Sequence, residues 1–231
     1  KLMMNIWIDL WELFFPRCCV VCDERLARSE EFLCFKCLSS LPRSNTQINK
    51  EMEKGLWGKI PVERAHSFLY YTKGGDVRKL LYELKYYRNP RIGHYLGRCM
   101  AEELVPTGFF DGIDYIIPVP LHKKKQETRG YNQSEQLAAG ISSVVGCEVL
   151  DDVLIRVKQA DTQTRKGHYE RWINVKDVFD YVPSRDLSGK HILLLDDVFT
   201  TGATIVACAD VLKQIPDLRI SVLTLALAGE N

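Results

Sequence analysis

The sequence has little net charge and no long apolar run, and each shortage limits what the protein can do. Its 31 Lys and Arg residues are nearly balanced by 30 Asp and Glu residues, which leaves a formal net charge of +1. A chain this neutral has no overall attraction for nucleic acid or a membrane, so any such partner must use a local patch. No stretch approaches the roughly 18 apolar residues of a membrane-spanning helix, so we expect no membrane span.

We also expect no secretory signal. The amino-terminal stretch 2–15 is apolar, but Asp9 and Glu12 interrupt it and no small-residue cleavage site follows. We interpret this stretch as a short amphipathic helix that packs on its own chain or on a partner protein rather than on lipid. Because nothing directs the chain to an oxidising compartment, we place it in the cytoplasm with its eight cysteines reduced.

Four of the cysteines form two Cys-x-x-Cys pairs, which are Cys19 with Cys22 and Cys34 with Cys37. Four thiolates complete a tetrahedral zinc shell and leave no open position, so we predict a structural Zn²⁺ site. Two disulfides or four unrelated thiols are the alternatives. Cys18 is a possible replacement for Cys19, and we favour Cys19 because it gives both pairs the same spacing. A segment this small has too little hydrophobic core to fold without a bound metal. We therefore predict a zinc module at 1–45 followed by a linker at 46–66.

The stretch 191–204 carries the strongest functional signal. Residues 192–195 predict a buried strand, Asp196 and Asp197 stand where that strand reaches its carboxyl end, and a hydroxyl-rich turn then leads into a helix. The turn consists of Thr200, Thr201, Gly202, Ala203 and Thr204. Free amides at the start of a helix attract an anion, and carboxylates accept hydrogen bonds from vicinal hydroxyls, so the pattern suits a ribose 5-phosphate. The alternative is a buried strand, two capping acids and an ordinary turn.

This stretch resembles the phosphoribosyl pyrophosphate (PRPP) binding motif of type I phosphoribosyltransferases. The resemblance implies that Asp196 and Asp197 hold the ribose 2- and 3-hydroxyls and that the turn 200–204 cradles the 5-phosphate. It also implies an α/β fold over residues 67–231, with a central, mainly parallel sheet flanked by helices. Ligands bind beyond the carboxyl ends of the strands in such sheets, which is where the two acids are expected.

A second buried strand is predicted at 115–120, followed by a basic loop at 121–130. Two prolines at the end of the strand force the chain out of the sheet, so the loop would face the same rim as the two acids. We therefore expect this loop to meet pyrophosphate, although a charge run of this kind is often just a solvated surface. The residues assigned to it are Pro120, Leu121, His122 and Arg129.

Segments 118–122, 129–133 and 137–138 resemble the hallmark of the competence protein F (ComF) family. That family joins a four-cysteine zinc module to a type I phosphoribosyltransferase domain, and the match runs from Cys19 to the end of the chain. The resemblance implies PRPP binding or phosphoribosyl transfer with Mg²⁺, a role in DNA uptake and natural transformation, and partners in the competence machinery. The chain departs from the family pattern at Lys125, where arginine is usual, and in its extra cysteine.

Two further stretches carry functional hypotheses. The polar stretch 158–171 predicts either an exposed loop or a lid whose cations, Arg165, Lys166 and His168, reach pyrophosphate when it closes. The basic and aromatic stretch 79–91 predicts helices with solvated faces or a surface for single-stranded DNA. Asp196, Asp197, Arg165 and Lys166 are the catalytic candidates. No residue stands out as a general base for an acceptor, so a DNA-binding protein that senses PRPP without turnover is the rival hypothesis.

Overall fold

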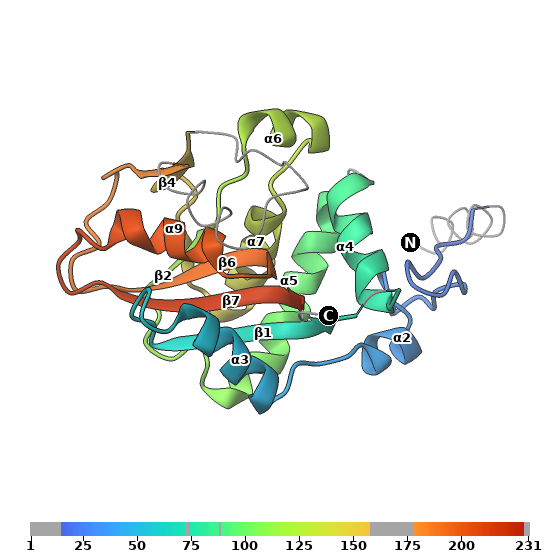
Figure 1. Ribbon diagram of the computed structural model, residues 1–231. Coiled ribbons are helices and arrows are strands. Elements are labelled where there is room, and N and C mark those ends of the chain that lie inside the picture. Colours follow the sequence, from blue (N-terminus) through green and yellow to red (C-terminus); the bar gives the residue numbers. More distant parts are fainter. Residues whose placement is uncertain (1–14, 73, 88, 158–177, 229–231) are drawn as a thin grey trace.

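A parallel β-sheet forms the centre of the computed structural model, which describes residues 15–72, 74–87, 89–157 and 178–228 (Figure 1). Within these residues the sheet has five strands in the order β1-β7-β6-β2-β3, and every pairing between them is parallel. The strands are β1 (Arg64–Tyr71), β2 (Tyr115–Pro118), β3 (Glu148–Val149), β6 (His191–Phe199) and β7 (Arg219–Ala228). The central strands are continuously apolar because helices cover both faces of the sheet.

Helices on the two faces of the sheet enclose two hydrophobic cores. Leu193 and Leu195 of β6 point into the core shared with α4, α5 and α7, whereas Ile192 and Leu194 point into the core shared with α3 and α9. This alternation is the two-residue period of a strand. The helices are α2 (Phe35–Ser40), α3 (Thr46–Leu56), α4 (Asp76–Tyr86), α5 (Pro90–Leu104), η1 (Val105–Thr107), α6 (Lys123–Arg129), α7 (Gln133–Val145) and α9 (Ala203–Leu212).

Helices α5 and α7 touch through their backbones. A Cβ atom added at Gly97 would collide with the carbonyl oxygen of Leu137, and one added at Gly140 would collide with the carbonyl oxygen of His94. Only glycine permits this approach. The contact fixes the position of α7, whose first turn carries Ser134 to the carboxyl edge of the sheet.

The cysteine module packs on the same face of the sheet as α4. Cys19, Val21 and Cys34 are buried in the core that also contains Leu80 of α4. The ammonium group of Lys79, one residue earlier on α4, donates a hydrogen bond to the carbonyl oxygen of Val21. The module is therefore joined to the α/β domain by both apolar and polar contacts.

The predicted fold class, a mainly parallel sheet flanked by helices with a small four-cysteine module at the amino end, is confirmed. The strands predicted at 115–120 and 192–195 are β2 and β6, and the second of these is longer than expected. None of the helices in the described ranges has both the length and the hydrophobicity that crossing a bilayer requires.

Three local predictions differ from the structure. The expected linker 46–66 contains helix α3, whose buried Met52 and Leu56 stand four residues apart among charged neighbours. The expected loop 121–130 contains helix α6, which His122 caps by accepting a hydrogen bond from the amide of Lys124. Residues 178–181 predict a further strand of the central sheet, but strand β5 (Phe179–Tyr181) pairs instead with β4 (Leu154–Arg156) in a separate antiparallel ribbon. The amino-terminal helix predicted at 2–15 and the lid predicted at 158–171 lie outside the described residues, save for Phe15.

Candidate active site

The two adjacent acids lie near the carboxyl end of β6, inside the strand rather than after it. Asp196 still pairs in register with Thr224 of β7, and the strand continues to Phe199. The Asp196 carboxylate accepts hydrogen bonds from the Asp197 amide at 2.8 Å and from the Ser134 hydroxyl at 3.3 Å. Pairing within the sheet therefore fixes the backbone that presents both carboxylates.

Asp196 is electrostatically strained. Two effects together raise the pKa of its carboxyl group to about 7. Burial is the larger effect, and the negative charge of the neighbouring Asp197 is the second. The Asp197 amide, the Lys85 ammonium and the Ser134 hydroxyl act in the opposite direction. Near neutral pH this carboxyl group exchanges its proton readily, a property that is common at functional sites.

Asp197 is held by a cation from a distant part of the chain. The Lys85 ammonium on α4 lies 2.8 Å from a carboxylate oxygen of Asp197, and the two side chains are 23% and 16% exposed. In Figure 1 the arrows of β1 and β7 point toward the end of the sheet at which α4 stands. Helix α4 thus forms one wall of the site.

The hydroxyl-rich turn follows directly and opens helix α9. Gly202 is the N-cap residue with φ 77°, a conformation that favours glycine, and its carbonyl oxygen accepts the first helical hydrogen bond, from the Val206 amide at 2.9 Å. The amides of residues 203–205 precede that bond and are the ones that a helix start offers to an anion. A Cβ atom at Gly202 would lie 2.8 Å from the ring of Phe199, so the turn is also tightly packed.

The loop assigned to pyrophosphate begins beside the acids. Pro118 of β2 pairs with Leu195, the residue before Asp196, and the Val119 amide donates to the Leu195 carbonyl at 2.8 Å. The side-chain amide of Asn132 donates to the Val119 carbonyl at 3.0 Å, which fixes where the chain leaves the sheet. Residues 120–122 therefore start at the level of the two acids.

Cations from three elements gather near the same edge. A pocket of about 400 Å³ lies between α4 and α6, lined by Lys85, Tyr86, Lys125, Thr128 and Arg129. Burial, and then the positive charges of Arg156, Arg129 and Lys85, lower the pKa of Lys125. The Nε atom of Arg156 is buried and has no hydrogen-bond partner among the described residues. Like charges held this close favour the binding of an anion between them.

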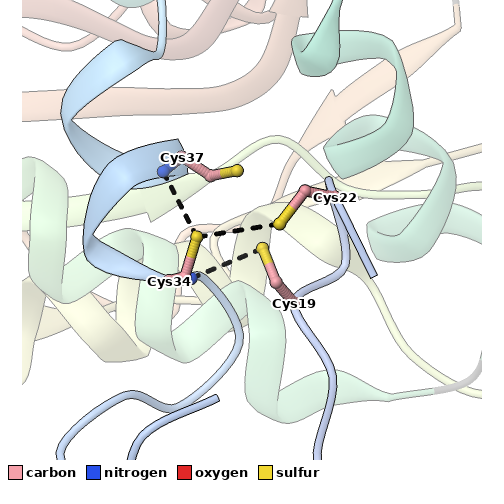
Figure 2. A group of neighbouring side chains, drawn as sticks. All are labelled: Cys19, Cys22, Cys34 and Cys37. Carbon is pink, nitrogen blue, oxygen red and sulfur yellow. Dashed lines mark hydrogen bonds between the residues drawn. The ribbon is translucent and has the colours of Figure 1, made fainter. Parts of the chain in front are cut away.

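The cysteine module brings four thiols to one point, and Figure 2 shows the sulfur atoms of Cys19, Cys22, Cys34 and Cys37 facing a common centre. All four ligand atoms lie within 4.8 Å of one another, and the sulfurs of Cys22 and Cys34 are 3.8 Å apart. Sulfur atoms placed about 2.3 Å from a central zinc ion would be separated by about 3.8 Å in a tetrahedron. The cluster is therefore a possible metal site, and its donor set fits zinc.

The geometry separates Cys19 from Cys18. Cys19 is buried, its sulfur accepts from the Cys34 amide at 3.4 Å, and the Cys18 thiol instead donates to the Pro16 carbonyl at 3.5 Å. Burial raises the pKa of the Cys19 thiol, but backbone amides, the Cys34 amide first among them, outweigh burial and lower it to about 7. A thiol of this kind is easily ionised, as a metal ligand must be.

The structure thus brings most of the expected site residues to one edge of the sheet: the two acids, the turn 200–204 and the loop 120–122. Arg129, at the end of α6, lines the same pocket as Lys85, with its guanidinium group 5.6 Å from the centre of the Tyr86 ring. Arg165, Lys166 and His168 lie outside the described residues. Sequence reasoning missed the roles of Lys85, Ser134 and Arg156, because no local pattern links them to the acids.

Fold and site together define an α/β protein with an acidic pair at the carboxyl edge of a parallel sheet and an attached cysteine module. No family model matches the chain. It is 28% identical over 199 residues to DNA utilization protein YhgH of Escherichia coli O157:H7, an alignment that covers 85% of this chain and 84% of the relative. It is 34% identical over 114 residues to competence protein F of Haemophilus influenzae, which covers 49% of this chain and 50% of that protein.

The expected resemblance to competence protein F is therefore confirmed, and YhgH is a relative along most of the chain. Among solved structures, an adenine phosphoribosyltransferase aligns with 61% of this chain and 72% of its own length, at 15% identity and a TM-score of 0.41. The fold is defined by the parallel strand order β1-β7-β6-β2-β3 and not by this alignment.

Proposed function

We propose that the protein binds PRPP at the carboxyl edge of its sheet and is built to displace pyrophosphate from carbon 1 of the ribose. One observation carries the proposal: adjacent carboxylates on β6 are followed within a few residues by a glycine-capped helix start. Asp196 and Asp197 would accept hydrogen bonds from the ribose 2- and 3-hydroxyls. The turn 200–204 would hold the 5-phosphate through its amides and threonine hydroxyls. This assignment agrees with the type I phosphoribosyltransferase motif that the sequence resembles.

The crowded cations suit the other end of the same ligand. Pyrophosphate would lie against the loop 120–122 and the positive charges of Lys125 and Arg129, with Arg156 facing them from β4. Mg²⁺ held by the pyrophosphate oxygens and by water would neutralise the charge of the leaving group. Arg165 and Lys166 belong to the same proposal as cations of a closing lid.

Displacement needs little covalent chemistry from the protein. The bond from carbon 1 to the pyrophosphate oxygen would break, with its electron pair leaving on pyrophosphate. A lone pair of the acceptor would form the new bond, and the acceptor's proton would pass to water. Positive charge builds on the sugar before the new bond is complete, as in glycoside transfer. The contribution of the chain is to orient the ribose, bind the leaving group and exclude water.

Calorimetric titration with PRPP and Mg²⁺ tests the proposal. Asp197→Ala should weaken binding by roughly 10- to 100-fold, because each hydrogen bond to a charged group contributes about 1.5–3 kcal/mol. The change also frees Lys85 to meet the phosphates, so the measured loss is smaller than the full contribution of the lost hydrogen bonds. Asp210→Ala, an exposed acid on α9 paired with Lys213, is the matched control and should bind as the wild type does. Equal affinity of the Asp197 variant and the wild type would reject the site.

The cysteine cluster has a simpler proposed function. Four thiolates at tetrahedral spacing would hold a structural Zn²⁺, and closed thiolate sites of this kind stabilise small modules that have little core of their own. Because Cys19 and Cys34 also belong to the core around α4, the metal would help to fix the wall of the site that carries Lys85.

Binding of single-stranded DNA is the second candidate function, and one surface favours it. A pocket of about 380 Å³ lies between the cysteine module and α4, and Arg78, Lys79, Tyr82 and Tyr87 are among the residues that line it. Tyr82 and Tyr87 are 54% and 62% exposed. Aromatic rings beside cations suit stacked bases, and the relatives are named for DNA utilization and competence. On this proposal the protein acts in DNA uptake together with the competence machinery, and PRPP is a substrate or a regulatory ligand.

An oligothymidylate tests this surface. Replacing Arg78 by Ala and Tyr87 by Ser should weaken binding several-fold. The slope of log affinity against log salt concentration should become shallower by about one, because one phosphate contact is lost. Unchanged affinity and salt slope would remove this surface from the proposal. Release of pyrophosphate from PRPP over a panel of acceptors separates an enzyme from a protein that only binds the ligand.

A further inference from the structure

Three side chains around the start of α7 hold three different parts of the candidate site by hydrogen bonds. The first contact is to helix α4, the second is to the chain where it leaves β2, and the third is to an acid of β6. The donor and acceptor residues are Tyr131 with Leu84, Asn132 with Val119, and Ser134 with Asp196, at 2.6, 3.0 and 3.3 Å. This short segment, residues 131–134, therefore sets the wall, the loop and the acid relative to one another.

Asn132 stands at the centre of this segment and is only 2% exposed. Its side-chain oxygen accepts a hydrogen bond from the Ser134 amide at 3.1 Å, which caps α7. Both hydrogens of its side-chain nitrogen are also used, one by the Val119 carbonyl and one by the Glu135 carboxylate, each at 3.0 Å. Asp caps a helix equally well without any N–H, so capping does not explain the contacts of the nitrogen.

The direction of the chain beyond Val119 depends on that nitrogen. Val119 lies between two prolines, and neither proline has an N–H with which to hold the chain. The Val119 amide donates to the Leu195 carbonyl at 2.8 Å, so the chain is fixed up to this residue. The rigid peptide plane that carries the Val119 carbonyl then sets the direction of the loop 120–122, and Asn132 holds that plane.

We infer that Asn132 is a positioning residue for the leaving group: it directs the loop 120–122 toward the pyrophosphate of a ligand whose ribose lies on Asp196. The inference rests on the proposed function, because it requires that loop to bind pyrophosphate. Ser134, two residues later, bonds to Asp196, so one short segment sets the separation between the two ends of the ligand. Errors in that separation are costly, since a displacement of about 1 Å can lower a rate about 100-fold.

Calorimetry on the full chain with ribose 5-phosphate and with PRPP, each with Mg²⁺, tests the inference. The ratio of the two affinities measures what pyrophosphate contributes. The wild type should bind PRPP about 100-fold more tightly, because each hydrogen bond between charged groups contributes about tenfold or more. Asn132→Asp keeps the capping oxygen but has no N–H for the Val119 carbonyl. It should lower the ratio at least about tenfold and leave the affinity for ribose 5-phosphate within about twofold.

Two further variants separate positioning from charge and from capping. Asn132→Ser adds no charge and its hydroxyl can cap α7, but its shorter side chain does not reach the Val119 carbonyl, so it should lower the ratio as Asn132→Asp does. Asn89→Asp is the matched control, because the Asn89 side chain caps α5 through the same kind of bond, from the Arg91 amide at 3.2 Å. This control should keep the wild-type ratio.

The outcomes separate the two proposals. If ribose 5-phosphate does not bind to the wild type, the proposed function fails, and this inference fails with it. If it binds but PRPP binds no more tightly, only the positioning role is overturned. The same follows if Asn132→Ser keeps the wild-type ratio or weakens the binding of both ligands equally. Thermal unfolding identifies a variant that has lost its fold, and Asn132→Asp alone decides the matter if Asn132→Ser does not fold.

Discussion

The raised pKa of Asp196 makes a sharp prediction about stability. In the unfolded chain this carboxyl group should titrate near its ordinary value of about 4, whereas in the folded protein its pKa is about 7. Between these values the folded protein holds a proton that the unfolded chain has lost. The contribution to stability is therefore fully present below about pH 4 and is lost as the pH rises through about 7. Asp196→Asn, which keeps the shape but cannot ionise, should remove this loss.

The magnitude follows from the size of the shift. Three pKa units at about 1.36 kcal/mol each give an upper limit of about 4 kcal/mol for the difference between the two ends of this range. The asparagine side chain in this variant retains an oxygen that can accept the Ser134 hydrogen bond, so packing changes should be small. Relative to the wild type, the variant should therefore be more stable at pH 8 than at pH 5, by up to a few kcal/mol.

Urea unfolding at pH 5 and pH 8 measures the effect. The free energy of unfolding is extrapolated to water for the wild type, for Asp196→Asn and for the control Asp210→Asn, an exposed acid on the helix that follows the turn. Groups remote from Asp196 titrate equally in the wild type and in Asp196→Asn, so the difference between these two proteins reports Asp196 together with Asp197, the acid coupled to it. A constant difference between Asp196→Asn and the wild type at both pH values would refute the argument that burial and Asp197 hold this proton.

Two other predictions address the metal module and the turn. Cys37→Ser should lower bound zinc from one ion per chain, measured by atomic absorption, and should lower the melting temperature, whereas Cys18→Ser should change neither. Gly202→Ala should destabilise the protein by more than about 1 kcal/mol in chemical unfolding, because φ is 77° there and the new Cβ would press on Phe199; wild-type stability would contradict the described turn.

Much of the fold could be predicted because its signals are local. The run 115–120 predicted β2, and the apolar run 192–195 predicted β6. The two acids were expected at the carboxyl end of that strand, and they lie near it. In each case the pattern of apolar residues follows from which side chains are buried, so the element can be predicted from the sequence.

Helices α3 and α6 were missed because polar residues dominate both segments. In α3 the buried pair Met52 and Leu56 is surrounded by charged side chains, and in α6 none of the described residues is buried. Charged residues with good helix propensity look the same in a loop and in an exposed helix until capping and tertiary contacts are known. The same applies to β5, whose three residues gave no signal of which strand they would join.

The ion pair between Lys85 and Asp197 could not be predicted at all. Lys85 stands in a basic and aromatic stretch that suggested a nucleic-acid surface, and its link to the acids arises only because α4 and β6 pack against the same edge of the sheet. Spacing along a chain identifies residues that share an element. Contacts between elements depend on the topology of the fold. Here the topology places α4, a helix from the amino-terminal half of the chain, against the acids of β6.

One comparison tests the central claim that the acidic pair holds the ribose hydroxyls. Ribose 5-phosphate and 2-deoxyribose 5-phosphate are titrated into the wild type and into a variant in which Asp196 and Asp197 are both replaced by Asn. The wild type should bind the deoxy sugar about tenfold more weakly, and the variant should distinguish the two sugars far less, because the carboxylate that accepts from the missing hydroxyl is one of the two removed. An equal preference for the ribose in both proteins would show that the hydroxyls are held elsewhere.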